Sequence, residues 1–286
     1  DPDVLAAEGK LAALQGDLRL ATERLTACLA ARPDDADACY ALGVVHGRAG
    51  AAEAAVSTLE TAQRLAPHDP SIREALARAR FARARDLARY GRVREARTLL
   101  EMTVEADPAA VAPRAALADL LRLSGDVALG EAQVREMIRR DPDDALARRM
   151  LAAMLAQRGA MEEATHELIA AAERHADDWT VWAALSAAYL ELGDVRRAEE
   201  IAGRARDVAP GEPGSLAPLL QVLVDTGRAA DAVALVEGAR DGNPGEARYH
   251  VLRAMLHTRA QEHREALAAC RRALALLPGT TESVER

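Results

Sequence analysis

Apolar residues recur at the spacing of an α-helix, and short breaks separate the helical stretches. Leu185, Tyr189 and Leu192, for example, are four and three residues apart and so share one face of a helix. Glycine and proline alternate at the breaks. Both end helices, because glycine readily adopts a positive φ and proline lacks a backbone N–H. The pattern predicts an all-α chain of helix hairpins, with about sixteen helices.

The breaks repeat with a period of 34 residues, which indicates an internal repeat. The prolines that mark it are Pro33, Pro67, Pro108, Pro142, Pro210, Pro244 and Pro278. A glycine occupies the fifteenth position of seven units, at Gly16, Gly50, Gly91, Gly125, Gly159, Gly193 and Gly227, and Gln261 replaces it in the last. We therefore expect one solenoid of eight repeats, about 2–35, 36–69, 77–110, 111–144, 145–178, 179–212, 213–246 and 247–280, with a tail at 281–286.

Residues 70–76 interrupt the period before the third repeat. Seven residues make about two helical turns, so we predict that they lengthen a helix, Ser71 to Arg89, without changing which face points inward. We expect this helix to project beyond the stack.

A small residue occupies the twentieth position of every repeat. These residues are Ala21, Ala55, Ala96, Gly130, Ala164, Ala198, Ala232 and Ala266. Such a constraint indicates close contact between two helices. Aromatic residues make up only 2% of the chain, so alanine and leucine must fill the core, as they can in thin stacked layers.

The repeat resembles the tetratricopeptide repeat from Pro2 to Thr280. The sixth repeat is the best match, with Trp182, Leu185, Ser186, Tyr189, Gly193, Ala198, Ala205 and Pro210 at the signature positions of that family. The resemblance implies a right-handed superhelical solenoid. It also implies that the first helix of each repeat lines a concave groove that holds a peptide or a partner protein.

Charge and motifs exclude several classes of function. The net charge of −8 argues against a general nucleic-acid binder. The motifs of phosphate loops, dinucleotide sites, zinc proteases and hydrolases are missing from the sequence, so we expect no enzyme and no cofactor. His250 and His257 are two helical turns apart, but they take the place of core aromatics and are interpreted as core residues, not metal ligands. A run of 18 apolar residues is also missing, so we expect no direct insertion into a membrane.

The inward positions that the resemblance implies divide the groove into two halves. The first half is basic and contains the only phenylalanine of the chain. Its predicted partner-binding residues are Tyr40, Val44, Arg48, Arg78, Phe81, Arg85, Arg89, Arg122 and Arg149. The second half is apolar, with Leu146, Leu190, Val224, Val251 and Met255 among its residues. Because guanidinium groups suit carboxylates, we expect the ligand to carry negative charge.

The main interpretation is a non-catalytic scaffold or adaptor that binds an acidic or amphipathic protein segment, extended or helical. A second is the regulatory or substrate-docking array of a larger enzyme, such as a glycosyltransferase or sulfotransferase, whose catalytic domain lies outside these residues. A third is an assembly factor of the bacterial envelope or of secretion. A cytoplasmic location is favoured. The periplasm stays open because the chain begins with Asp1, before which a leader could have been removed.

The last repeat leaves apolar residues without a capping helix. Leu267, Leu274, Leu276 and Leu277 lie in its second helix, and only a short polar segment follows. Solenoids need polar outer faces at their ends. We therefore expect a longer parent chain, a second copy or a partner chain to cover this end.

Overall fold

The computed structural model describes residues 1–276, and within them the chain forms sixteen α-helices, one short 3₁₀ helix and no strand. The helices are α1 (Pro2–Gln15), α2 (Leu18–Ala31), α3 (Ala36–Arg48), α4 (Ala52–Leu65), α5 (Pro70–Arg89), α6 (Val93–Ala106), α7 (Val111–Leu123), α8 (Val127–Arg140), α9 (Ala145–Gln157), α10 (Met161–Arg174), α11 (Trp179–Glu191), α12 (Val195–Val208), η1 (Pro213–Leu216), α13 (Ala217–Asp225), α14 (Ala229–Gly242), α15 (Ala247–Arg259) and α16 (His263–Ala275). The predicted all-α repeat solenoid is confirmed.

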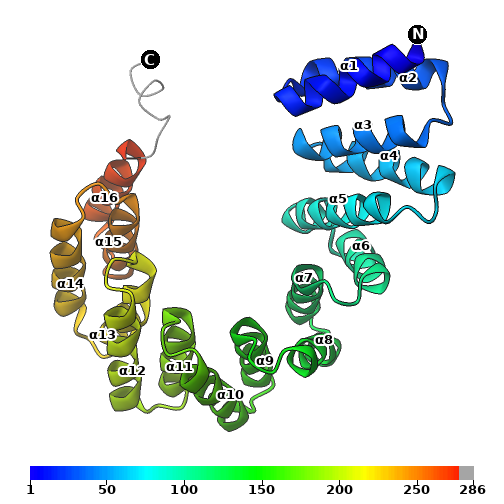
Figure 1. Ribbon diagram of the computed structural model, residues 1–286. Helices are drawn as coiled ribbons and strands as arrows, with labels where there is room; N and C mark the ends of the chain where they lie inside the picture. The colour runs from blue at the N-terminus through cyan, green and yellow to red at the C-terminus, as the bar shows by residue number, and fades with distance from the viewer. Residues whose placement is uncertain (277–286) are drawn as a thin grey trace. The chain divides into compact units, whose positions relative to one another are not determined.

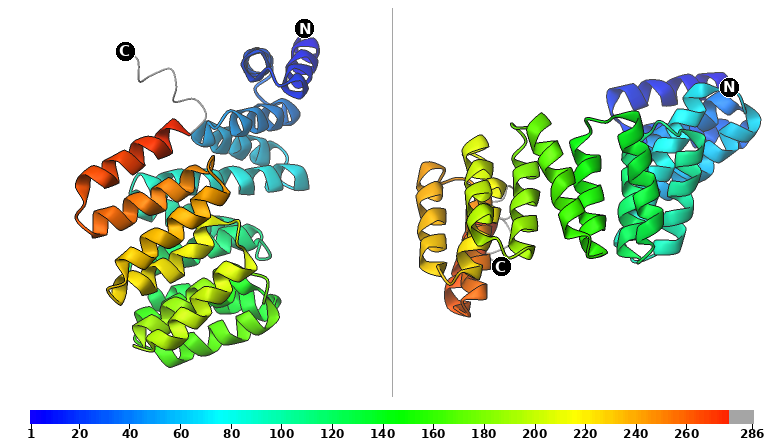
Figure 2. Two further views of the ribbon diagram at one scale, coloured as in Figure 1. Left: turned by 90° about the vertical axis from the view of Figure 1, so that its left-hand side faces the viewer. Right: turned by 90° about the horizontal axis from the view of Figure 1, so that it is seen from below.

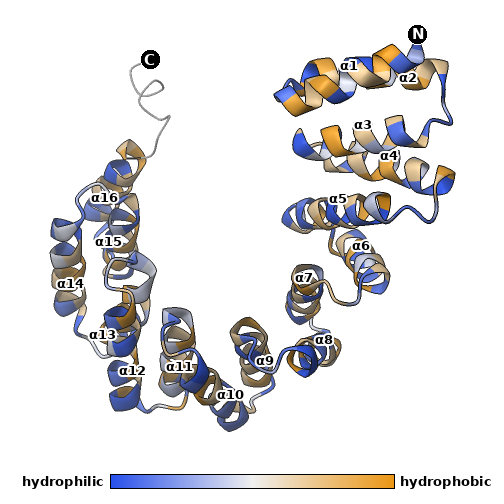
Figure 3. Cartoon of the chain, viewed as in Figure 1, coloured by the Kyte–Doolittle hydropathy of each residue, from blue (hydrophilic) through white to orange (hydrophobic). Residues whose placement is uncertain are grey.

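The helices group into two compact units, Asp1–Met137 and Ile138–Arg286, and the boundary falls inside α8. In the first unit α1 packs on α2, α3 on α4 and α5 on α6, and each second helix packs on the first helix of the next hairpin (Figure 1). The second unit repeats this order from α9 to α16, and Figure 2 gives two further views of the hairpins. Most helices carry both hydrophobic and hydrophilic residues, as Figure 3 shows, so one face of each can be buried.

The predicted turn and contact positions are confirmed. All seven glycines of the fifteenth position have positive φ, and Gln261 adopts a φ of 60° in their place. The small residues of the twentieth position are all buried, and Ala21, Ala55, Ala96, Ala198 and Ala232 are 0% exposed. The small residue of this position is therefore enclosed in the contact that the second helix makes with its neighbours.

Helix α5 is 20 residues long and packs on different neighbours along its length. Near its start, Ile72 clusters with Cys39 of α3 and Ala62 of α4. Toward its end, Leu87 clusters with Leu100 of α6. Ile72, Leu76 and Leu87 are all buried. The α3–α4 hairpin therefore covers the start of this helix, and α6 of its own hairpin covers its end. The expectation that the helix projects beyond the stack is wrong in this respect, since its last turns pass only the α3–α4 hairpin and stay packed on α6.

Because α5 is longer than the other helices, the α3–α4 hairpin and α6 contact it at different points along its axis. Arg83 Nη2 donates to Glu53 Oε1 at 2.8 Å, and Glu53 lies in the first turn of α4. The residues of α5 after Arg83 therefore extend past that end of the α3–α4 hairpin. Seven residues correspond to about 10 Å of helix, and this offset leaves room on both flanks of α5.

Gly43 and Gly47 lie one turn apart on α3 in different surroundings. A Cβ atom at Gly43 would lie 2.5 Å from Leu59 Cγ, whereas a Cβ atom at Gly47 would meet nothing within 4 Å. We expect Gly43→Ala to lower the free energy of unfolding by about 1 kcal/mol and Gly47→Ala to raise it by about 0.5 kcal/mol, since alanine favours helix. Chemical denaturation measures both changes. An equal loss at the two positions would contradict the close contact of α3 and α4.

Candidate functional site

Eight of the nine predicted groove residues lie in the first unit. Helix α3 carries Tyr40, Val44 and Arg48, helix α5 carries Arg78, Phe81, Arg85 and Arg89, and helix α7 carries Arg122. Arg149 lies on α9 in the second unit. The first unit is therefore where a candidate site can be described.

A hollow of about 680 Å³ opens between α3 and α5, and five predicted residues line it. We call it the arginine hollow. Its lining residues are Gly43, Val44, Gly47, Arg48, Gly50, Ala52, Leu59, Ala75, Arg78, Ala79, Ala82, Arg85, Asp86 and Arg89. Tyr40, Phe81 and Arg122 lie outside this lining.

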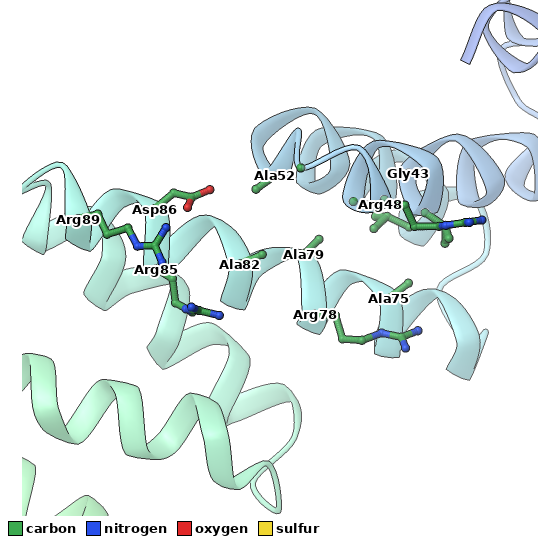
Figure 4. Close-up of a pocket in the computed structure, with 14 residues that line it drawn as sticks. Gly43, Arg48, Ala52, Ala75, Arg78, Ala79, Ala82, Arg85, Asp86 and Arg89 are labelled. Carbon is green, nitrogen blue, oxygen red and sulfur yellow. The ribbon is translucent and has the colours of Figure 1, made fainter. Parts of the chain in front are cut away.

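Small side chains create the hollow. Gly43 lines it from α3, and Ala75, Ala79 and Ala82 line it from α5 (Figure 4). Gly47 of α3 also belongs to the lining. Because none of these residues has a long side chain, the two helices leave space between them instead of interdigitating. Leu59 of α4 lies beneath the hollow and is only 1% exposed.

Four arginines line this space, and Asp86 is the only carboxylate among its lining residues. Arg85 and Arg89 lie toward one end of the row of alanines in Figure 4. Both are exposed, and within the described part of the chain neither forms an ion pair with a carboxylate. The positive charge at this end of the hollow is therefore available to a ligand.

The other two arginines are held by neighbours. Arg48 Nη1 donates to the carbonyl oxygen of Ala13 at 2.6 Å, and Arg78 Nη1 lies 3.5 Å from Glu74 Oε1. The carbonyl contact orients Arg48 without neutralising its charge. Arg78 is partly compensated, and exposed pairs of this kind contribute little energy.

The predicted residues outside the hollow have other contacts. Tyr40 packs against the cores that contain Ala62 and Leu76. Arg122 donates two hydrogen bonds to Asp119 Oδ1, at 3.0 and 2.7 Å. Phe81 lies on α5 with the guanidinium of Arg85 over its ring, 5.9 Å from the centroid.

The predicted inward positions, counted from a third repeat that starts at Ala77, did not include Ala75, Ala82 or Asp86. Helix α5 starts at Pro70, 34 residues after Ala36, so its first turns continue the register of α3. The undisturbed 34-residue spacing from Ala36 to Pro70 would have identified Ala82, which takes the place on α5 that Arg48 has on α3. Ala75 and Asp86 occupy no inward position in either register, and only the structure places them in the lining.

The predicted apolar half of the groove lies in the second unit and includes exposed apolar residues. Leu146, Val251 and Met255 of the predicted apolar half are exposed. At the last hairpin Leu267, Leu274 and Leu276 are exposed as well, and Leu277 lies outside the described residues.

Two histidines of the last repeat lie in its core. His250 and His257 are 5% and 7% exposed, and His257 Nδ1 is 2.6 Å from Glu262 Oε2. Burial, together with nearby arginines, lowers the pKa of His250. Residues 1–276 hold no cluster of three or more His, Cys, Asp or Glu side chains that could bind a metal ion. None of their helices is long and apolar enough to cross a membrane.

Hairpin stacking and an open, charged surface hollow together define a helical-repeat protein of the scaffold class. Models of the tetratricopeptide repeat match residues 12–79, 115–178 and 219–280, and the chain belongs to this family. The repeats of this family indicate a protein–protein interaction scaffold, and the fold is typically non-catalytic.

Two curated relatives are similar over most of this chain, and both are named cellulose synthase operon protein C. The protein from Xanthomonas axonopodis pv. citri (strain 306) is 30% identical over 251 residues, which are 83% of this chain and 16% of that protein. The protein from Pseudomonas fluorescens (strain SBW25) is 28% identical over 243 residues, 81% of this chain and 19% of that protein. The chain therefore spans less than a fifth of the length of these relatives.

Solved structures share the fold at low sequence identity. A tetratricopeptide repeat protein from Parabacteroides merdae ATCC 43184 has a TM-score of 0.59 and 14% identity, covering 93% of this chain and 98% of its own. YrrB, described as a TPR protein with an unusual peptide-binding site, has a TM-score of 0.50 and 16% identity, covering 68% and 97%. At these identities the likeness concerns the fold alone.

Proposed function

We propose that the chain is a non-catalytic scaffold that binds an acidic or amphipathic protein segment along α3, α5 and α7. The arginine hollow is the observation that supports this most strongly. Arg85 and Arg89 concentrate positive charge beside a row of alanines in a protein whose net charge is −8. A planar guanidinium group can donate two parallel hydrogen bonds to one carboxylate, so these side chains suit Asp and Glu of a partner.

Phe81 and Arg122 extend the proposed surface along α5 and α7. An amphipathic segment would place its carboxylates near the arginines and its apolar side chains near Phe81. Arg122 is already paired with Asp119, so we expect it to contribute less than Arg85 or Arg89.

The proposal predicts that the purified chain binds a fluorescein-labelled peptide of alternating glutamate and serine. Arg85→Ala should weaken this binding by about three- to tenfold at low salt, because an exposed charge-assisted hydrogen bond is lost, and by less at high salt. Fluorescence anisotropy titrations at two salt concentrations measure the change.

Arg94→Ala is the matched control. It removes the same charge from an exposed position on α6 that does not line the hollow. Equal weakening by Arg85→Ala and Arg94→Ala would mean that only net charge matters. Equal binding of a lysine–serine peptide would contradict selection for negative charge.

A second candidate is favoured by the similarity to cellulose synthase operon protein C over 83% of the chain. This candidate places the repeats within a longer protein. The acidic segment that they bind then belongs to another product of a cellulose synthase operon. Co-purification of the tagged chain with each such product tests it. Retention that does not require Arg85 and Arg89 would place the contact elsewhere.

A further inference from the structure

A second hollow lies on the opposite flank of α5 from the arginine hollow. Its volume is about 410 Å³, and it is bounded by the first half of α5, the end of α6 and the start of α7. We call it the apolar slot, after the apolar residues that line it: Pro70, Ala77, Phe81, Ala106, Ala110, Ala112 and Pro113. The start of α7 at Val111 follows that of α5 at Pro70 by 41 residues, seven more than the repeat period, so the first turns of α5 extend beyond the register of α7 and leave room for the slot.

Four of the five polar residues around the slot, Glu74, Arg78, Thr103 and Asp107, already have partners. Thr103 is 1% exposed, and its Oγ1 donates to the carbonyl oxygen of Leu99 at 2.6 Å. Asp107 Oδ1 accepts from the backbone N–H of Ala109 at 3.0 Å, and Glu74 lies within 3.5 Å of Arg78. The slot therefore offers an apolar side chain contact without leaving a buried polar group unpaired.

The apolar slot and the arginine hollow meet along one face of α5. Arg78 lines both of them. Phe81 lines the slot, while Arg85, whose guanidinium lies over the Phe81 ring, lines the hollow. The ring thus orients Arg85 and joins the apolar surface to the charged one.

We infer that the apolar slot receives a large apolar side chain, such as leucine, from the same acidic segment whose carboxylates bind Arg85 and Arg89. This inference rests on the proposed function. It commits to an acidic partner because the positive charge of the adjoining hollow selects one, whereas the rim of the slot carries two arginines, Arg73 and Arg78, and two carboxylates, Glu74 and Asp107, and so adds no net charge.

Helix geometry sets the spacing within the ligand. Arg85 and Arg89 follow Phe81 by four and eight residues, or roughly 6 and 12 Å along the axis of α5. An extended peptide covers about 3.3 Å per residue, so roughly two to four residues separate the leucine from the glutamates. Both chain directions of the peptide satisfy this spacing.

The probes are labelled heptapeptides with two adjacent glutamates and a leucine three residues away, made in both directions, and the same peptides with serine in place of leucine. With the unmodified chain, at least one leucine peptide should bind about tenfold more tightly than its serine counterpart, since burial of a leucine side chain is favourable by more than this. Ala112→Phe should abolish that preference by filling the slot, because Ala112 is exposed and lines it.

Ala109→Phe is the matched control, since it adds the same ring at an exposed position that does not line the slot. It should keep the preference for leucine. Circular dichroism checks that both variants are folded, and the comparison of peptides on the unmodified chain does not depend on either.

The outcomes separate the two proposals. If leucine and serine peptides bind equally well but Arg85→Ala still weakens both, the slot is not part of the site and the proposed function stands. If neither peptide binds, or if binding ignores Arg85→Ala, both proposals fail.

Discussion

We expect Leu59→Ala to lower the free energy of unfolding by about 2–5 kcal/mol. Leu59 is 1% exposed and lies in one cluster with Val56 of its own helix and with Ala75 and Leu76 of α5. Removal of its three distal carbons leaves a cavity between α3, α4 and α5, because the backbone of a helix hairpin can move inward only in part. Urea denaturation followed by circular dichroism measures the loss.

Two further variants test the cause of this loss. Leu65→Ala truncates an exposed leucine of the same helix and should cost well under about 1 kcal/mol. The double variant Gly43→Ala/Leu59→Ala should lose less stability than the sum of the single losses, because a Cβ atom at residue 43 points to within 2.5 Å of Leu59 Cγ. Strict additivity would contradict direct packing of these two residues.

Overpacking of the sixth repeat should also be costly, with Ala198→Leu lowering the free energy of unfolding by up to about 3 kcal/mol. Ala198 is 0% exposed at the contact between α11 and α12. Ser186 Oγ of α11 donates to the Ala198 carbonyl oxygen at 2.9 Å, so separation of the helices would break a buried hydrogen bond.

Thermal denaturation compares this variant with Ala187→Leu, which adds the same side chain to an exposed position of α11. The control should change stability by less than about 0.5 kcal/mol. A similar shift of the melting temperature in both variants would mean that α11 and α12 do not meet at Ala198.

The helices and their pairing could be predicted because their signals are local. A glycine such as Gly193, with a φ of 77°, ends one helix, and an alanine such as Ala198 lets the next approach it closely. These requirements recur every 34 residues, so one register explains most of the chain. Gln261 is the instructive exception, since it adopts a positive φ without being glycine. The neighbouring hairpin geometry overrides its own preference.

The candidate site was predicted only in part. The inward positions of the repeat identified Arg48, Arg85 and Arg89, because charge in a first helix can be recognised from the repeat register. They did not identify Ala75 or Ala82, which make room for a ligand and carry no functional group of their own. A small residue signals a hollow only when the position of the opposite helix is known.

The amino-acid sequence alone was sufficient for the all-α class, the helix hairpins, the family resemblance and the concentration of arginines in the first half. These properties depend on residues close together in the chain and on a period that repeats them. Tertiary structure decided how α5 shares its 20 residues between two hairpins, and so where the arginine hollow and the apolar slot open. These positions depend on which neighbours bury side chains such as Ile72 and Leu87. Packing between helices that are separate in the sequence determines this burial, so the local sequence does not specify it.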